Sequence, residues 1–232
     1  LPERASAAYV EAVFDAFAGS FDARLAGLGY RAPQLVVDAI LRHLPGRAAP
    51  AAADLGCGTG LVGPVLRPHV AQLTGCDLSV GMLELAERRG VYDHLFRVDL
   101  IEFLRNEVAR FDAITCADTL CYLGDLAAVA AGAAVSLRPG GVFACTVEAL
   151  PIGSRDRWTL TPSGRYAHAD HYVRAVFEAS GLDVVDLRRD TLRTEAGLPV
   201  DGLVVAATRA STACPPSPVS GSDASPARRP RS

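Results

Sequence analysis

The sequence contains no lysine, and all 23 of its basic residues are arginine. This excludes a phosphate-binding loop of the type G-x-x-x-x-G-K-S/T, in which the lysine contacts the nucleotide phosphates. The formal net charge of −3 provides no basic surplus for binding nucleic acid or an acidic membrane surface. We therefore expect neither nucleic acid nor a membrane as a partner.

The sequence also lacks a long hydrophobic run. No apolar stretch approaches the roughly 20 residues of a membrane span. No charged start followed by an apolar stretch indicates a signal peptide. The chain begins with Leu1 rather than methionine, which we interpret as an excerpt from a longer protein.

Paired cysteine motifs are missing as well. No two cysteines form a C-x-x-C pair, and no histidine accompanies them at zinc spacing. We therefore predict no metal site and expect buried thiols in a reducing, cytoplasmic location. The six cysteines are Cys57, Cys76, Cys116, Cys121, Cys145 and Cys214.

From Ala51 onward, short apolar runs alternate with helical stretches, which is typical of a parallel sheet covered by helices. The expected strands are 51–54, 72–77, 95–98, 111–116, 142–147, 183–187 and 203–207. The expected helices are 61–66, 80–89, 101–107, 126–137 and 171–180. Because no helix separates the last two strands, we expect an antiparallel C-terminal hairpin at the sheet edge. We predict an α/β fold with a seven-stranded, mostly parallel sheet and helices on both faces.

The ends of the chain differ from this alternating region. Between Tyr9 and Leu28, apolar residues recur at helical spacing and Gly19-Ser20 interrupts them, which predicts two short helices. A third helix is expected to start near Pro33. From Ser211 onward Pro, Ser and Ala dominate without periodicity, which is typical of disorder. We predict an N-terminal helical lid over 1–47, a cofactor-binding domain over 48–210 and a disordered tail over 211–232.

The stretch DLGCGTG, residues 54–60, places Gly56, Gly58 and Gly60 directly after the first expected strand. Glycines there let the backbone turn sharply and approach a ligand closely. Ligands of open α/β sheets bind outside the carboxyl ends of the strands, where this loop lies. The dinucleotide fingerprint G-x-G-x-x-G would need its third glycine at Leu61. That mismatch argues against a nicotinamide-dependent oxidoreductase.

The same stretch resembles the first motif of the class I S-adenosylmethionine-dependent methyltransferases. Three further features fall where this resemblance requires them: Asp77 in LTGCDLS, Asp99 in FRVDL and the turn LRPGG at 137–141. The resemblance covers roughly residues 9–209 and implies a Rossmann-like sheet and S-adenosylmethionine as the cofactor. A closer similarity is to the methyltransferase domain found behind tetratricopeptide-type helical repeats, carried by YVEAVFDAFAGSFDARLAGLGYRAP and SGRYAHADHYV. Such a repeat domain would precede Leu1.

The resemblance also implies the cofactor contacts. Asp54 would hold the ammonium side of the cofactor through the loop or a water, and Gly56, Gly58 and Gly60 would line its methionine part. Asp77 would bind the ribose, and Leu78 and Met82 would flank the adenine. Asp99 and Leu100 would lie at the edge of the adenine, and Ala117 would approach its amino group by backbone. Tyr9 is expected on the lid over the cofactor. The alternatives are helix N-capping by Asp77 or Asp99 and plain packing by Met82 or Tyr9.

The segment CADTLCYLGDL after the fourth expected strand should face the methyl acceptor. Asp118 and Tyr122 are its candidate acceptor contacts, with Tyr122 also a candidate catalytic residue. The alternatives are a turn cap for Asp118 and core packing for Tyr122. The segment lacks the Asn/Asp-Pro-Pro-aromatic tetrad of enzymes that methylate nucleic-acid amines or glutamine side chains, which disfavours those substrates.

An insertion at 150–170 adds polar and aromatic residues over the ligand edge of the sheet. Arg165 and Tyr166 are candidate substrate contacts, and arginines there would suit an anionic acceptor. His168 is the candidate general base, because its pKa needs little adjustment; the alternative is a cap or surface residue.

These patterns together predict an S-adenosylmethionine-dependent methyltransferase that acts on a small or medium-sized acceptor. The alternative function is a non-catalytic scaffold or partner domain that binds the same cofactor.

Overall fold

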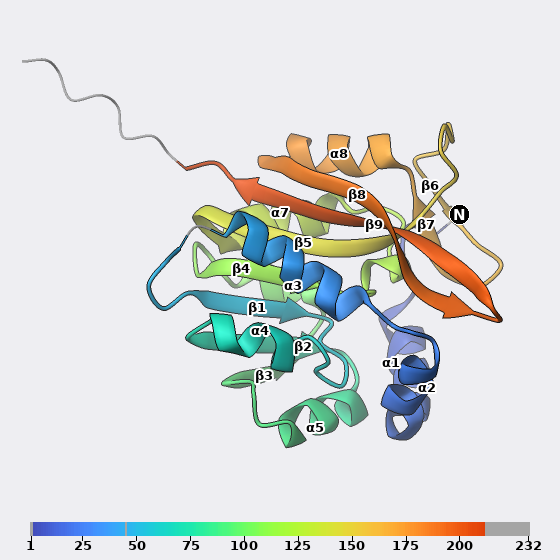
Figure 1. The fold of residues 1–232 in the computed structure, drawn as a ribbon, viewed down its shortest axis with the longest axis horizontal. Coiled ribbons are helices and arrows are strands. Elements are labelled where there is room, and N and C mark those ends of the chain that lie inside the picture. Colours follow the sequence, from blue (N-terminus) through green and yellow to red (C-terminus); the bar gives the residue numbers. More distant parts are fainter. Residues whose placement is uncertain (1, 45, 212–232) are drawn as a thin grey trace, which may run out of the picture.

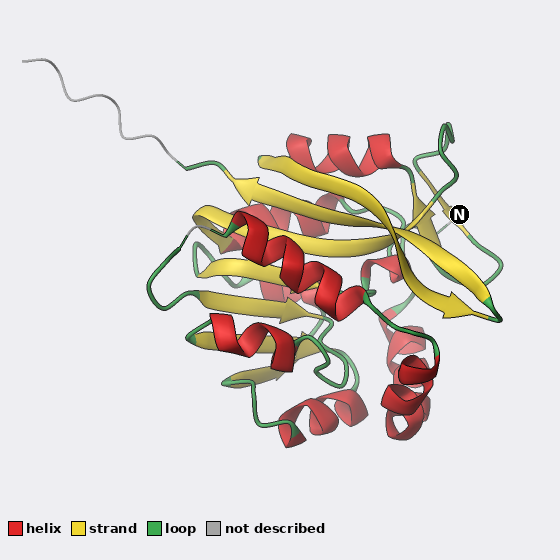
Figure 2. Ribbon diagram, viewed as in Figure 1, coloured by secondary structure: helices red, strands yellow, loops and turns green. Residues whose placement is uncertain are grey.

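A twisted sheet crosses the molecule and carries helices on both of its faces (Figures 1 and 2). The computed structural model describes residues 2–44 and 46–211. The part of the predicted tail beyond residue 211, including Cys214, lies outside the described residues. Within the described residues, no helix combines the length and the apolar character needed to cross a membrane.

The sheet has the strand order β3-β2-β1-β4-β5, with β9 and then β8 on the other side of β5. Strands β1 to β5 pair in parallel, and β9 runs antiparallel to both β5 and β8. The strand bounds are β1 Ala51–Leu55, β2 Gln72–Asp77, β3 His94–Arg97, β4 Phe111–Cys116, β5 Leu137–Ala149, β8 Leu182–Glu195 and β9 Leu198–Arg209. The predicted mostly parallel sheet and its antiparallel C-terminal hairpin are confirmed.

Two further strands correct the predicted number of seven. Strands β6 (Trp158–Leu160) and β7 (Tyr166–His168) form a short hairpin within the insertion at 150–170. Strand β7 pairs in parallel with Glu148 and Ala149 of β5, past the residues of β5 that pair with β4. Three-residue strands are too short to show an alternating hydrophobic pattern, so no local pattern predicts them.

The helices form two layers. Helices α3 (Ala32–His43) and α4 (Gly63–Leu66) contribute apolar side chains to one face of the sheet. Helices α6 (Leu100–Arg105), α7 (Ala127–Ser136) and α8 (Asp170–Ala179) cover the opposite face. Helix α5 (Val80–Arg88) packs beside β2 and β3. The helix after the glycine stretch begins at Gly63 rather than at the predicted position 61, because residues 60–62 still belong to the turn.

The N-terminal helices α1 (Ala7–Phe17) and α2 (Phe21–Gly27) lie beyond the carboxyl ends of the parallel strands (Figure 1). A short 3-10 turn at Ala18–Ser20 separates them, as the Gly19-Ser20 break predicts. Polar contacts fix them to the sheet layer: Ser79 donates to Asp15, and Thr59 donates to Asp22. The predicted lid region 1–47 thus contains two different parts, since α3 packs on the sheet and only α1 and α2 reach over its end.

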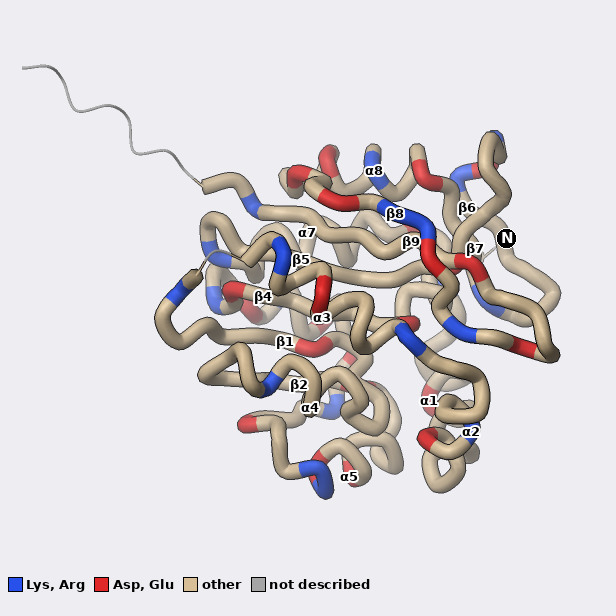
Figure 3. Tube along the Cα trace, viewed as in Figure 1, with Lys and Arg blue, Asp and Glu red and all other residues tan. Residues whose placement is uncertain are grey.

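Charged residues of both signs are interspersed over the surface, for instance along β8 (Figure 3). One carboxylate, Asp112 at the start of β4, is buried with only 2% of its surface exposed. It accepts hydrogen bonds from the Ala51 amide at 2.9 Å, from Arg47 at 2.6 Å and from Arg138 at 2.7 Å. These bonds connect the starts of β1 and β5 at the end of the sheet opposite the N-terminal helices.

Replacing this carboxylate should weaken the fold without touching the ligand edge. The variant Asp112→Ala leaves the Ala51 amide unsatisfied, and we expect it to lower the free energy of unfolding by about 1–3 kcal/mol. Urea unfolding followed by circular dichroism measures this loss. The matched control is Asp183→Ala, at an exposed carboxylate of β8 that makes no ion pair within the described residues. Equal stability of the two variants would contradict the prediction.

Candidate functional site

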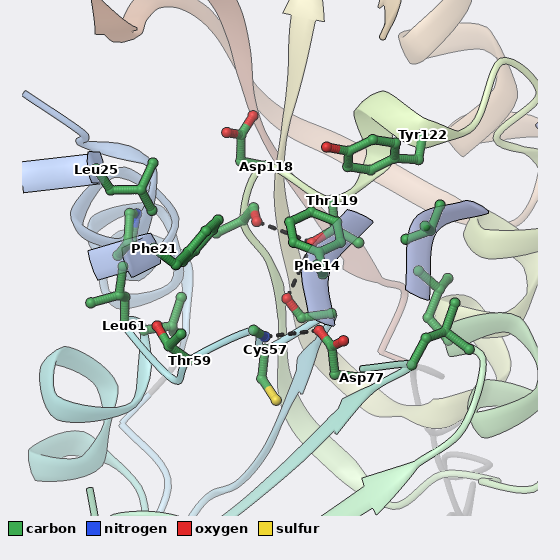
Figure 4. Close-up of a pocket in the computed structure, with 18 of the residues that line it drawn as sticks. Phe14, Phe21, Leu25, Cys57, Thr59, Leu61, Asp77, Asp118, Thr119 and Tyr122 are labelled. Carbon is green, nitrogen blue, oxygen red and sulfur yellow. Dashed lines mark hydrogen bonds between the residues drawn. The ribbon is translucent and has the colours of Figure 1, made fainter. Parts of the chain in front are cut away.

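A cavity opens at the carboxyl ends of β1, β2 and β4, below α1 and α2 (Figure 4). The glycine stretch, the end of β2 and the segment after β4 form one side of it. Apolar side chains of α1 and α2, among them Phe14, Phe21 and Leu25, form the other side. Of the predicted site residues, those that line the cavity are Gly56, Gly58, Asp77, Leu78, Asp99, Leu100, Ala117, Asp118, Tyr122 and Arg165.

The glycine turn has a left-handed backbone, with φ of +62° at Gly56 and +54° at Gly58. A Cβ atom at Gly56 would lie 2.4 Å from the Thr119 Cγ2, so the close approach of Thr119 requires glycine there. A Cβ atom at Gly58 would have no neighbour within 4 Å. Gly56 therefore serves the packing of the turn, whereas Gly58 leaves space open on a residue that lines the cavity.

Asp77 at the end of β2 connects that strand to the glycine turn. One carboxylate oxygen accepts a hydrogen bond from the Gly58 amide at 2.9 Å, and the other accepts from the Ser79 amide at 2.9 Å. Burial raises the pKa of Asp77, although these amides oppose the shift. Ser79, not Asp77, caps the following helix α5 by accepting from the Met82 amide. Each carboxylate oxygen keeps lone-pair capacity for a further donor.

Asp99 both caps a helix and lines the cavity. One oxygen accepts from the Ile101 amide at 2.9 Å at the start of α6, and the other accepts from Arg4 at 2.6 Å. Burial alone would raise the pKa of Asp99, but the hydrogen bond and the charge of Arg4 outweigh it and lower the pKa. The capping role and the cavity position, weighed above as alternatives, therefore occur together.

Four residues predicted to contact the cofactor do not line the cavity. Asp54 is buried and accepts from the Tyr92 hydroxyl at 2.7 Å and from Thr115 at 2.9 Å, and burial raises its pKa to about 7. Gly60 packs against the Tyr92 ring, and Met82 is fully buried. Tyr9 is 54% exposed on α1.

His168 lies inside the protein rather than in the cavity. Its side chain is fully buried at the end of β7, where it stacks on the Tyr172 ring. The Nε2 atom lies 3.1 Å from the Gly124 carbonyl oxygen, to which it donates, and Nδ1 has no partner within the described residues. Burial lowers its pKa to about 4, although the carbonyl opposes this. Its imidazole is therefore not placed to take a proton from an acceptor in this cavity.

Tyr122 and Tyr166 have different surroundings. The Tyr122 ring lines the cavity and meets the Phe14 ring edge-on at 5.6 Å. Burial raises the pKa of Tyr122 to about 12, so its phenol stays protonated near neutral pH. Tyr166 is buried and donates its hydroxyl hydrogen to the Pro2 carbonyl at 2.7 Å, away from the cavity.

Several cavity residues escaped the sequence analysis. Tyr30, Arg193 and Glu195 line the cavity. Arg193 and Glu195 belong to β8, which continues to Glu195, eight residues beyond the predicted end of that strand at residue 187. Tyr30 lies in the turn between α2 and α3. No motif marks these positions, since they join the site only through the pairing of β8 with β9 and the docking of residues 28–31 against β8.

Comparisons with known proteins agree with the fold. The family described as Methyltransferase domain matches residues 53–143. The chain is 38% identical over 138 residues to Methyltransferase-like protein 27 of Homo sapiens, covering 58% of this chain and 56% of that protein. It is 30% identical over 166 residues to a Ubiquinone biosynthesis O-methyltransferase of Xanthomonas axonopodis pv. citri, covering 63% of this chain and 70% of that protein. The chain thus spans little more than half the length of the human relative.

Among solved structures, the cyclase SpnF has a similar fold. It superposes with a TM-score of 0.72 at 18% sequence identity, covering 91% of this chain and 98% of that chain. At this level of identity the similarity concerns the fold alone.

The buried His168 should make stability depend on pH. Its pKa is lowered from 6.5 to about 4 in the folded state, so the unfolded chain binds the proton more readily. Stability is therefore highest above pH 6.5 and falls as the pH decreases toward 4, by about 3 kcal/mol from this residue. The variant His168→Gln should show a correspondingly smaller loss between these pH values, measured by urea unfolding at each pH.

The matched control for this prediction is His69→Gln, at an exposed histidine. It should keep the pH profile of the unmodified protein, because its side chain is exposed and forms no hydrogen bond within the described residues. Identical profiles for all three proteins would contradict the assignment of a buried neutral imidazole.

Proposed function

Because the chain belongs to the family of S-adenosylmethionine-dependent methyltransferases, we propose that it transfers a methyl group from this cofactor to a small or medium-sized acceptor. The observation that carries this proposal is one cavity that joins two kinds of surface. Gly58, Asp77 and Asp99 lie on the cofactor side, and Asp118 and Tyr122 lie beside an apolar wall on the other.

The residues on the cofactor side suit S-adenosylmethionine. The open space at Gly58 admits a ligand against the backbone, as a residue with a Cβ would not. Asp77 would accept hydrogen bonds from the ribose hydroxyls, and Asp99 and Leu100 would contact the adenine edge. Leu78, Ala117 and Gly56 would complete this side of the site. Asp54 and Gly60 would act by supporting the turn, since neither reaches the cavity.

The bound cofactor supplies a sulfonium-activated methyl group, so the protein mainly has to align an acceptor and exclude water. The chain provides apolar cover for this purpose: Phe14, Phe21 and Leu25 face the glycine turn across the cavity (Figure 4). Tyr122, with its protonated phenol, can donate a hydrogen bond to the acceptor but is a poor general base near neutral pH.

We propose that α1 and α2 move as the lid. Their polar ties to the sheet layer all come from three carboxylates: Glu11 pairs with Arg97, Asp15 accepts from Ser79, and Asp22 accepts from Thr59 and Arg89. Helix α1 has no buried residue. Addition of the cofactor should slow amide hydrogen exchange across residues 9–28, because the ligand contacts the inner face of these helices. The amides of α7 serve as internal control. An unchanged exchange profile in 9–28 would exclude the lid.

The alternative is a scaffold or partner domain that binds the cofactor without catalysis. The observation in its favour is that the cyclase SpnF has the same fold, so the fold does not determine the reaction. The resemblance to domains that follow tetratricopeptide-type repeats would suit such a partner role. The name of the Xanthomonas relative favours catalysis, with an oxygen atom as the methylated position.

The decisive experiment measures binding and turnover separately. We expect calorimetry to detect S-adenosylmethionine and S-adenosylhomocysteine but not NAD. Incubation with labelled S-adenosylmethionine and fractionated metabolites should release S-adenosylhomocysteine together with a labelled product. Binding without turnover would favour the scaffold, and binding of NAD alone would overturn the family assignment of the site.

A pair of glycine variants tests where the cofactor lies within the cavity. Gly58 and Gly90 both have left-handed backbones, with φ of +54° and +65°, and a Cβ atom at either would meet nothing within 4 Å. Alanine at either position should therefore cost a similar backbone strain of about 1–2 kcal/mol. Only Gly58→Ala should also weaken S-adenosylmethionine binding, by about tenfold or more. Equal affinities of the two variants would show that the cofactor does not lie against Gly58.

A further inference from the structure

Two arginines and three carboxylates meet at the acceptor side of the cavity. Arg193 is 1% exposed and uses all three guanidinium nitrogens on carboxylates. Its Nη1 donates to both oxygens of Asp118 at 2.9 Å, its Nε donates to Glu195 at 2.6 Å, and its Nη2 donates to Glu148. Arg165 donates to Glu195 at 2.6 Å and lies 3.6 Å from Glu148. We name these five residues the acceptor ion cluster.

The acceptor ion cluster has a formal charge of −1, because three carboxylates face two guanidinium groups. From their residue type alone, the arginines of this region were expected to suit an anionic acceptor. The structure weakens that expectation, since all three guanidinium nitrogens of Arg193 are paired and Arg165 is paired through Nη1 with Glu195. The charged side chains that line the whole cavity also carry one excess negative charge, which disfavours the entry of an anionic acceptor. They are Arg4, Arg165 and Arg193 against Asp77, Asp99, Asp118 and Glu195.

Asp118 presents the cavity with a hydrogen-bond acceptor held in a fixed place. Its backbone is left-handed with φ of +52°, which is uncommon outside glycine. The Asp118 amide donates to the Thr146 hydroxyl at 2.8 Å, and Arg193 holds the carboxylate from behind. An ionised carboxylate can only accept hydrogen bonds. The group that binds beside it must therefore carry a hydrogen, as a hydroxyl or an amine does and a carboxylate does not.

Tyr30 adds a second polar group near Asp118. Its side chain lines the cavity, and within the described residues its hydroxyl has no hydrogen-bond partner. Burial raises its pKa, and the charge of Asp118 adds to the shift. The Leu28 carbonyl and the Arg31 amide are both bonded to β8 beside Arg193, which fixes the position of this turn. The phenol is thus a neutral donor or acceptor available to a ligand.

The remaining wall of this part of the cavity is apolar. Its side chains are Phe14, Phe21, Leu25, Leu28, Pro33 and Leu61. Phe14 and Phe21 meet edge-on with their ring centroids 5.9 Å apart. Such a wall gains most from a ligand with a flat or apolar skeleton.

We propose that the methyl acceptor is an uncharged, apolar, preferably aromatic molecule whose reacting atom is a hydroxyl oxygen or an amine nitrogen, held by Asp118 and Tyr30. Arg193 is a positioning residue that fixes Asp118. In the transfer, the oxygen or nitrogen lone pair forms the new bond to the methyl carbon while the carbon–sulfur bond breaks, and the acceptor hydrogen leaves as a proton to water. This inference rests on the proposed function.

Three matched probes test the acceptor class: 4-butylphenol, 4-butylaniline and 4-butylbenzoate, which share a ring and an apolar tail. Their binding is measured by calorimetry on the intact chain saturated with S-adenosylhomocysteine. We expect the phenol and the aniline to bind at least about tenfold more tightly than the benzoate. Tighter or equal binding of the benzoate, or no binding of the phenol at about 1 mM, would overturn the proposal.

Variants assign the preference to the named residues. Asp118→Asn removes the negative charge and adds an amide donor, so the preference against the benzoate should fall to about threefold or less. Tyr30→Phe should weaken binding of the phenol severalfold while leaving S-adenosylhomocysteine affinity unchanged. The charge-matched control is Asp183→Asn, at an exposed residue, which should keep the full preference. A preference that survives Asp118→Asn intact would overturn the role of Asp118.

The two proposals fail in different ways. A chain that does not take up S-adenosylhomocysteine contradicts the proposed function. A chain that takes it up but prefers the benzoate contradicts only the acceptor class. If Asp118→Asn does not fold, the probe preference of the unmodified chain and the Tyr30→Phe result decide the matter.

Discussion

The hydrogen bond from the Gly58 amide to Asp77 is the interaction on which the ligand edge of this protein depends. It joins the turn after β1 to the end of β2, and the backbone of this turn is left-handed at Gly56 and Gly58. A second contact, from the Thr119 hydroxyl to the Gly56 carbonyl, joins the same turn to the segment after β4. Three neighbouring parallel strands therefore end at one set of mutually fixed backbone groups, and the cavity forms above them.

The other half of the cavity is built by different forces. Helices α1 and α2 supply apolar side chains, and the far part of β8 supplies Arg193 and Glu195. Buried charges are costly unless they are paired, and here every nitrogen of Arg193 is paired with a carboxylate. The same pairing that makes the cluster tolerable in the interior occupies every guanidinium nitrogen of Arg193 and leaves an excess of negative charge. The same set of ion pairs therefore stabilises the buried charges and sets the charge that a methyl acceptor meets.

The acceptor side also shows why a residue type does not define a role. His168 has a side chain that often serves as a general base, and it lies in the insertion at 150–170. The structure buries it at the end of β7, against Tyr172 and the Gly124 carbonyl. Tyr30, by contrast, occurs in a turn that no sequence motif marks, and it lines the cavity. Where an insertion folds back on itself, closeness in sequence to the end of a strand does not predict that a side chain lies in the cavity.

Local patterns were sufficient for most of the fold. The alternation of apolar runs and helical stretches indicated the parallel strands β1 to β5, and the missing last helix indicated the β8–β9 hairpin, because strand and helix periods are properties of neighbouring residues. The glycine spacing and Asp77 indicated the turn, because φ angles and strand ends are local as well. The tertiary structure alone decided three other features: the extension of β8 to Glu195, the pairing of β7 with the end of β5, and the contact of Arg193 with Asp118, which are 75 residues apart. Strand register and the pairing of buried charges depend on which distant segments come together, and no short stretch of sequence carries that information.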